Sequence, residues 1–206
     1  MSSRTASTRS RSTPLRPVVE TLAAMAVVSG AFWLAGVVAG PLARLLFVLS
    51  TPALARPWTL ATSVYAHAGL GHLLANAVVV AVAGLPVAAS TTRARFHAFV
   101  LATGAIAGLA QVWLGGLLFP GGVGVVGSSG AAFALVGYVV AANPAADALG
   151  RLARRLGVSP RVVVGAVAVL ALLVAVAFSG PGSALIAHFV GLACGLGAGR
   201  TRLLRV

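Results

Sequence analysis

Six apolar runs divide the chain, each separated from the next by charged residues, proline or glycine. They extend over residues 18–38, 70–89, 96–119, 128–142, 162–178 and 184–199. A transmembrane helix needs about 20 predominantly apolar residues, and most of these runs reach or approach that length. The pattern predicts an all-α, polytopic membrane protein with a bundle of six transmembrane helices.

The composition excludes an ordinary soluble protein. Hydrophobic residues make up 59% of the 206 residues and charged residues 8%, whereas about a quarter of a typical soluble domain is charged. Six spans with short loops use the whole length, so we expect one domain over residues 17–199. A disordered basic tail over 1–16 would precede it and a short tail over 200–206 would follow. The single cysteine, Cys194, excludes a disulfide framework.

The basic residues predict the orientation of the chain. All fifteen are arginine, and they lie between the apolar runs. If the amino terminus is inside, only Arg44 and Arg56 fall outside, and the other thirteen face the cytoplasm. This bias requires an even number of spans, with both termini cytoplasmic in a multi-pass protein of the cell (inner) membrane. Because the arginines form no patch, the expected partner is the lipid bilayer and not nucleic acid.

The segment between the first two runs is too broken to cross a bilayer. Residues 40–66 contain Pro41, Pro52 and Pro57, with Trp58 and further apolar residues between them. We expect an outer-leaflet loop with short helices at the membrane surface.

Few polar residues lie inside the apolar runs, and five of them share one depth. His72 and Asn76 are near the start of the second run, Ser128 and Ser129 start the fourth, and His188 is near the start of the sixth. These three helices all enter from outside, so the five side chains lie in the outer part of the membrane. Polar groups are costly there and are therefore functional candidates. Each also has a structural interpretation, as an interhelical hydrogen bond, a packing serine or a snorkelling histidine.

Glycines surround the candidate serine and histidine. Gly127 and Gly130 flank the serine pair, where backbone N–H groups and the positive end of a helix favour an oxyanion. Gly191, three residues after His188, predicts close approach of the fourth and sixth helices, which would bring His188 toward Ser129.

Two further polar residues have structural interpretations. Gln111 lies in the third run, where a packing hydrogen bond explains it. His67, upstream of the second run, is interpreted as an anchor of the preceding loop.

The scarcity of acidic residues limits the possible chemistry. A serine hydrolase needs a base and oxyanion donors, and a carboxylate usually orients the base. The two acids, Glu20 and Asp147, are both predicted at the cytoplasmic end, so any such site must be a Ser-His dyad. The HExxH pattern of a metalloprotease and the paired membrane carboxylates of an aspartyl protease are both missing. We therefore expect no metal and no cofactor.

Three dispersed motifs, in this order, resemble the rhomboid family of intramembrane serine proteases. They are His67-Ala-Gly-Leu-Gly-His72-Leu-Leu-Ala-Asn76, Gly127-Ser-Ser129-Gly130 followed by Gly137-Tyr138, and Ala187-His188-Phe-Val-Gly191. The resemblance covers residues 18–199 and implies that Ser129 is the nucleophile and His188 the general base. It also implies an oxyanion hole made by His72, Asn76 and the Ser129 N–H. The substrates would be transmembrane segments of other proteins, cut near their outer ends.

Three positions depart from the family pattern. Thr59 stands where the family has an arginine after the tryptophan, here Trp58. The second run ends Gly84-Leu-Pro-Val-Ala88, without the glutamate that many members carry after the glycine. Phe133 replaces a tyrosine that often packs on the histidine. All of the reacting groups are retained.

Two functions from different classes follow from these patterns. The leading hypothesis is a serine endopeptidase that acts in or near transmembrane segments. The alternative is a noncatalytic rhomboid-like protein that binds transmembrane segments. A transporter or channel would need charges or broken helices near the midplane, and no charged residue is predicted at that depth.

Overall fold

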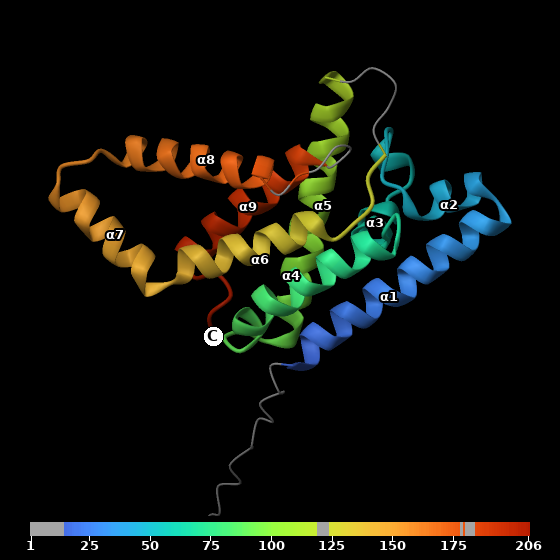
Figure 1. The fold of residues 1–206 in the computed structure, drawn as a ribbon, viewed down its shortest axis with the longest axis horizontal. Coiled ribbons are helices and arrows are strands. Elements are labelled where there is room, and N and C mark those ends of the chain that lie inside the picture. Colours follow the sequence, from blue (N-terminus) through green and yellow to red (C-terminus); the bar gives the residue numbers. More distant parts are fainter. Residues whose placement is uncertain (1–14, 119–123, 178, 180–183) are drawn as a thin grey trace, which may run out of the picture.

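The computed structural model describes residues 15–118, 124–177, 179 and 184–206, and this part of the chain is helical (Figure 1). The helices are α1 (Leu15–Val38), α2 (Gly40–Phe47), η1 (Ala53–Ala55), α3 (Thr59–Tyr65), α4 (Leu70–Ala88), α5 (Arg93–Leu118), α6 (Ser129–Ala142), α7 (Pro144–Arg155), α8 (Pro160–Ala177) and α9 (Leu185–Arg200). The predicted amino-terminal tail lies outside the described residues up to 14. Its last two residues, Leu15 and Arg16, belong to α1 instead, because the helix begins before the apolar run does.

Each predicted apolar run coincides with a helix, namely α1, α4, α5, α6, α8 and α9. Of these, α1, α4, α5 and α8 are long and apolar enough to cross a membrane. A fifth span results if α6 and α7 count together, although their axes differ by 59°. Helix α9 is apolar but has only 16 residues. The protein is therefore a multi-pass, all-helical membrane protein, and the count of six spans stays a prediction.

The bend between α6 and α7 follows from two residues. Asn143 precedes Pro144, and a residue before proline disfavours the helical conformation; its backbone is extended, with ψ of 140°. The Asn143 side chain then caps α7 by accepting the Ala145 N–H at 2.8 Å. Helix α6 thus ends at Ala142, and α7 leaves in a new direction.

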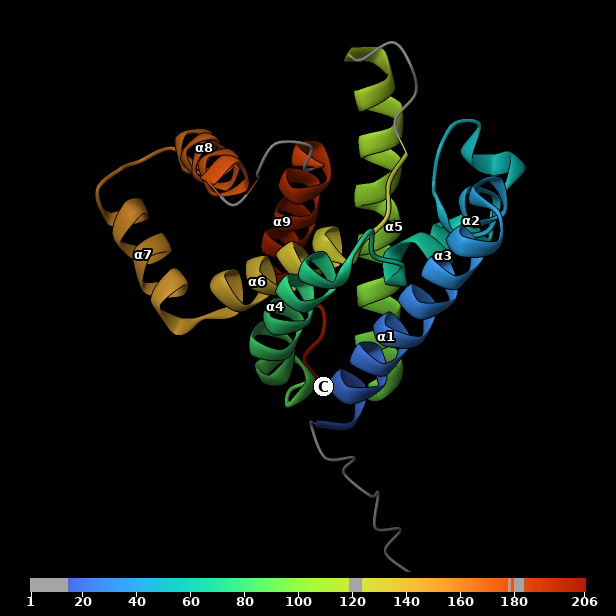
Figure 2. The ribbon, with the colours of Figure 1, turned by 45° about the vertical axis from the view of Figure 1, so that its right-hand side comes forward.

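Short helices occupy the predicted surface loop between α1 and α4. Helices α2 and α3 lie beside the carboxyl-terminal half of α1 (Figure 2). The Trp58 indole N–H donates to the Leu45 carbonyl at 3.1 Å, which ties α3 to α2. A single antiparallel bridge joins Leu49 to Val125, just before α6. The loop is therefore bonded to the segment that leads into the candidate site.

Helix α6 lies at the centre of the bundle and meets α9 backbone to backbone. A Cβ added to Gly191 would overlap the Gly130 carbonyl, and one added to Gly195 would overlap the Ala134 carbonyl. A Cβ on Gly137 would come within 2.5 Å of the Leu192 carbonyl oxygen. Small residues allow such approach between membrane helices. We call this contact the α6–α9 seam, and it fixes the beginnings of both helices side by side.

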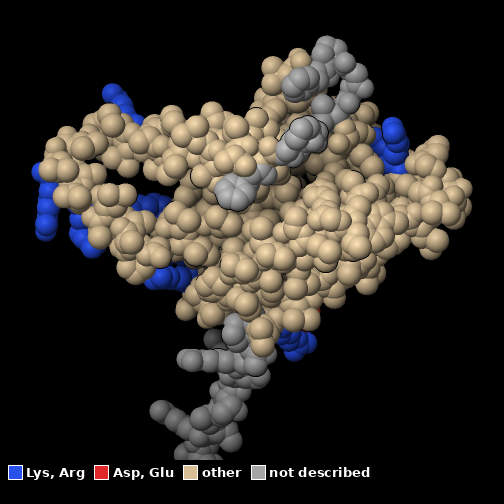
Figure 3. Space-filling model, viewed as in Figure 1, with Lys and Arg blue, Asp and Glu red and all other residues tan. Residues whose placement is uncertain are grey.

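On the face that Figure 3 shows, the arginines lie at the margins of the bundle. At the start of α1, Glu20 pairs with Arg16 at 3.0 Å, with Arg93 at 2.7 Å and with His97 at 2.9 Å. Because Arg93 begins α5, these contacts tie the first turns of α1 and α5 together.

The carboxyl terminus packs on the bundle and is not a free tail. Asp147 of α7 pairs with Arg200 at 3.0 Å and also with Arg202. Beyond α9, the buried Leu204 donates its N–H to the Tyr138 hydroxyl at 3.2 Å. Val206 donates its N–H to the Ser90 carbonyl, just before α5. The starts of α1 and α5 and the carboxyl terminus therefore share one end of the bundle.

Candidate active site

Ser129 and His188 lie near the beginnings of the two helices that meet in the α6–α9 seam. Ser129 is the first residue of α6, and the buried His188 lies in the first turn of α9. Phe133 stacks on the His188 ring with centroids 4.5 Å apart and planes 17° apart. Ser129 and Phe133 are four residues apart and hence on one face of α6. The predicted nucleophile therefore lies on the same face of α6 as Phe133, whose ring stacks on the predicted base.

Gly127 has a backbone conformation that glycine adopts most easily. Its φ is +126°, and its N–H donates to the Ser63 carbonyl at 2.8 Å. A Cβ at this position would lie 2.7 Å from His72 Cε1 and 2.9 Å from His72 Nε2. The missing side chain thus lets the His72 ring lie against residues 124–128, which lead to Ser129 and which we call the serine loop.

Asn76 is buried next to His72 on α4 and bonds to its own helix. Its Nδ2 donates to the His72 carbonyl at 2.9 Å. An amide has two N–H donors, so one remains for another acceptor. Of the two side chains predicted to bind an oxyanion, the His72 ring borders the serine loop, whereas the Asn76 amide is partly engaged by its own helix.

His67 joins α1 to the serine loop through both ring nitrogens. Nδ1 lies 3.0 Å from the Tyr65 carbonyl and 3.0 Å from Ser29 Oγ. Nε2 lies 3.1 Å from Ser128 Oγ and 3.3 Å from the Ser128 backbone nitrogen. Because a carbonyl only accepts, Nδ1 carries the proton, and Nε2 accepts from Ser128. The Trp33 indole also donates to the His67 carbonyl at 2.7 Å.

The imidazole of His67 is held neutral by its surroundings. It is fully buried, and burial lowers its pKa from 6.5 to about 4. A protonated ring would turn a second N–H toward the Ser128 N–H. His67, which the sequence predicts to anchor the preceding loop, thus also positions Ser128, the residue before Ser129.

Gln111 of α5 bonds to the residue before His188. Its Oε1 accepts the Ala187 N–H at 3.2 Å. This N–H is one of the first four of α9, which have no partner within the helix. Gln111 therefore makes a packing hydrogen bond, as expected, and its partner lies in the first turn of α9.

Ser179 contacts His188 and was not among the sequence candidates. Its Oγ lies 2.7 Å from His188 Nδ1. Ser179 follows α8 in a connection without helical periodicity, so no pattern in the sequence singles it out. Its distance of nine residues from His188 also matches no helical repeat.

The hydrogen bonds of the site are incomplete. Among the residues that the structure describes, no partner bonds to Ser129 Oγ or to Nε2 of His188. Catalytic hydrogen bonds are often long in free enzymes and tighten when the substrate binds. Within the same described ranges, no three His, Cys, Asp or Glu side chains gather as metal ligands would.

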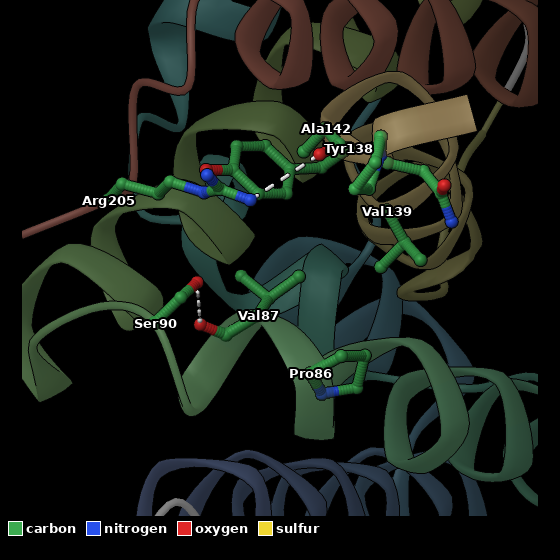
Figure 4. Close-up of a pocket in the computed structure, with 9 residues that line it drawn as sticks. Pro86, Val87, Ser90, Tyr138, Val139, Ala142 and Arg205 are labelled. Atoms are coloured by element: carbon green, nitrogen blue, oxygen red, sulfur yellow. Dashed lines mark hydrogen bonds between the residues drawn. The ribbon is translucent and has the colours of Figure 1, made fainter. Parts of the chain in front are cut away.

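A pocket of about 210 Å³ lies at the opposite end of α6 (Figure 4). Pro86, Tyr138, Ala142 and Arg205 are among its lining residues, and Arg205 closes one side by donating to the Ala142 carbonyl. Ala142 is the last residue of α6, so the pocket is about 20 Å from Ser129 at 1.5 Å per residue. It belongs to the packing of the carboxyl terminus and not to the candidate site.

The model of one known family matches most of the chain. The model of the Rhomboid domain matches residues 54–205, which is 152 of 206 residues and includes all three motifs. A comparison with curated proteins finds no match. A domain match of this extent, together with helices that place the three motifs around one serine loop, shows that the chain belongs to the rhomboid family, whose members are usually intramembrane serine proteases.

Proposed function

We propose that this protein is an intramembrane serine endopeptidase that hydrolyses peptide bonds in or near transmembrane segments of other proteins. The observation that carries the proposal is the α6–α9 seam, because its backbone contacts align the starts of the two helices that bear Ser129 and His188. The ring of Phe133 against His188 adds a second constraint on the base.

The proposed mechanism uses a dyad. Nε2 of His188 takes the Ser129 hydroxyl proton as Oγ attacks the peptide carbonyl. The oxyanion is stabilised by the Ser129 N–H at the start of α6, by His72 and by the second N–H of Asn76. His188 then gives the proton to the leaving amine, which leaves an acyl-enzyme. A water molecule, deprotonated by the same imidazole, hydrolyses the acyl-enzyme and restores Ser129.

The proposed topology has six spans with both termini in the cytoplasm. The charged end of the bundle, with Glu20, Asp147 and their arginine partners, would face the cytoplasm. The starts of α4, α6 and α9 would then lie in the outer part of the membrane. A substrate helix would have to unwind there, because the peptide bonds of an intact helix are shielded.

The experiment is cleavage of a single-pass reporter by the purified full-length protein in liposomes. We expect Ser129→Ala and His188→Ala each to lower the rate by about 10³-fold or more, as loss of a nucleophile or base does. Ser90→Ala is the matched control, because Ser90 bonds to Val87 at the other end of the bundle. If the Ser129 variant cuts as fast as the parent, the assignment is wrong.

The alternative is a noncatalytic protein that binds transmembrane segments. It is favoured by one observation, the lack of a described hydrogen bond at Ser129 Oγ. Under this alternative the reporter would bind to the parent protein and remain uncut. Equal affinity of the parent and the Ser129→Ala variant, with no product from either, would support it over the protease.

A further inference from the structure

His188 needs an orienting partner that no acid of this chain supplies. A histidine base must carry its proton on one nitrogen so that the other can accept. Glu20 is engaged by Arg16, Arg93 and His97, and Asp147 is engaged by two arginines at and just after the end of α9. Both carboxylates are thus committed at the opposite end of the bundle from the first turn of α9.

The hydroxyl of Ser179 bonds to the ring nitrogen of His188 that a carboxylate usually orients in a catalytic triad. Its Oγ is 2.7 Å from Nδ1 of His188, a normal distance for a strong neutral hydrogen bond. The Ser179 backbone N–H donates to the Val176 carbonyl at 3.1 Å, so the residue is fastened to the last turn of α8. The bond therefore joins the candidate base on α9 to the end of the neighbouring helix.

We propose that Ser179 is a positioning residue that accepts the Nδ1–H of His188 and leaves Nε2 free to take the Ser129 proton. This inference rests on the proposed protease function and adds a third member to its dyad.

Together, three contacts restrict the movement of the imidazole. The Phe133 ring lies nearly parallel to it at 4.5 Å and limits tilting of its plane. Gln111 holds the preceding residue through the Ala187 N–H. Neither contact prevents the ring from turning within its plane, whereas the Ser179 bond does. When the Ser179 hydroxyl accepts this bond, it also keeps the proton on Nδ1.

The expected effect is smaller than the loss of a triad carboxylate. Ser179 is uncharged, and neutral hydrogen bonds are about half as strong as charge-assisted ones. Loss of such a bond corresponds to a change of about 3- to 10-fold in rate. Because Ser179 acts through His188, the change should appear in kcat and leave KM within about 2-fold of the parent.

The test compares Ser179→Ala, Ser179→Thr and Ser159→Ala in the purified full-length protein in liposomes. Threonine keeps the hydroxyl, and Ser159 is a matched serine next to the other end of α8, where it bonds to Val162. Kinetics with the single-pass reporter give kcat and KM. Nitrogen NMR of histidine-labelled protein, taken without substrate, reports which ring nitrogen of His188 carries the proton.

We expect Ser179→Ala to lower kcat about 3- to 10-fold and to mix the two tautomers of His188. Ser179→Thr and Ser159→Ala should resemble the parent in both measurements. An unchanged kcat in Ser179→Ala, a threonine variant as slow as the alanine variant, or an unchanged tautomer would each reject the role of Ser179. If Ser129→Ala still cuts the reporter, the protease proposal itself fails, whatever the Ser179 variants do.

Discussion

The tautomer of His67 is determined by its neighbours, and the serine loop depends on it. The Tyr65 carbonyl can only accept, so Nδ1 donates and Nε2 receives the Ser128 backbone N–H. Ser128 is the residue before Ser129, so one buried imidazole connects α1 to the position of the candidate nucleophile. A neutral ring is required, because its protonation would place two donors face to face.

The first prediction concerns His67→Gln and its dependence on pH. Glutamine can replace the hydrogen bonds in part but does not titrate. At pH 7.5 we expect the variant to be less stable by about 1–3 kcal/mol, the usual cost of a disturbed buried hydrogen bond. Below pH 6.5, His67 of the unfolded chain binds a proton, while the folded protein resists until about pH 4. The parent therefore loses this part of its stability as the pH falls from 6.5 toward 4.

Denaturant unfolding of both proteins at pH 7.5, 5.5 and 4.5 checks this prediction. The other three histidines are present in both proteins, so their contributions cancel in the difference. We expect the difference in the free energy of unfolding to shrink with acidification. A difference that is the same at all three pH values would mean that His67 is not held neutral.

At the scale of the helices, the α6–α9 seam aligns the starts of the two helices that carry Ser129 and His188. Gly191 contacts the backbone of Gly130, next to Ser129, and Gly195 contacts the backbone of Ala134 one turn later. A methyl group at either position cannot be accommodated by rotating a side chain, since the obstacle is a carbonyl of the neighbouring helix. The seam therefore tolerates very little change in sequence.

The second prediction compares alanine at Gly191 and Gly195 with alanine at Gly197. Separating two packed helices costs about 1–3 kcal/mol or more, so the first two variants should melt at lower temperature. Gly191→Ala should also lose most reporter cleavage, because it separates the helices next to Ser129. Nothing lies within 4 Å of a Cβ at Gly197, so that variant should match the parent. Equal melting of all three variants would show that the seam is not tight.

The sequence predicts the positions of the helices well, because they follow apolar runs, and it predicts the α6–α9 contact from Gly191, three residues after His188. It does not predict the direction that α7 takes after Asn143, which depends on a proline and a capping side chain. It also does not predict which groups bond to the site residues. The partner of His188, Ser179, comes from a connection without a repeat, and the amide of Asn76 is turned to its own helix.

For the whole molecule, the predicted orientation requires the two chain ends on one side of the membrane. The starts of α1 and α5 and the carboxyl terminus share one end of the bundle, through Glu20 with Arg93 and through Ser90 with Val206. Arg44 and Arg56 lie in or near the short helices of the surface loop at the other end. Positive charge is retained on the cytoplasmic side of membrane proteins.

The third prediction is therefore a sidedness experiment. In a Cys194→Ala background, single cysteines are placed by Arg44→Cys and Arg154→Cys. A membrane-impermeant maleimide added to intact spheroplasts should label position 44 and not position 154, whereas permeabilised cells should allow labelling of both. Labelling of position 154 in intact spheroplasts, with position 44 protected, would reverse the topology.

The most direct test of the whole account is covalent labelling of the folded protein by a fluorophosphonate, followed by intact mass and peptide mapping. Such probes react with a serine hydroxyl that a neighbouring base activates. We expect one adduct, on Ser129, which is lost in His188→Ala and retained in Ser90→Ala. An unlabelled parent protein, or equal labelling of Ser129 with and without His188, would contradict the proposed dyad.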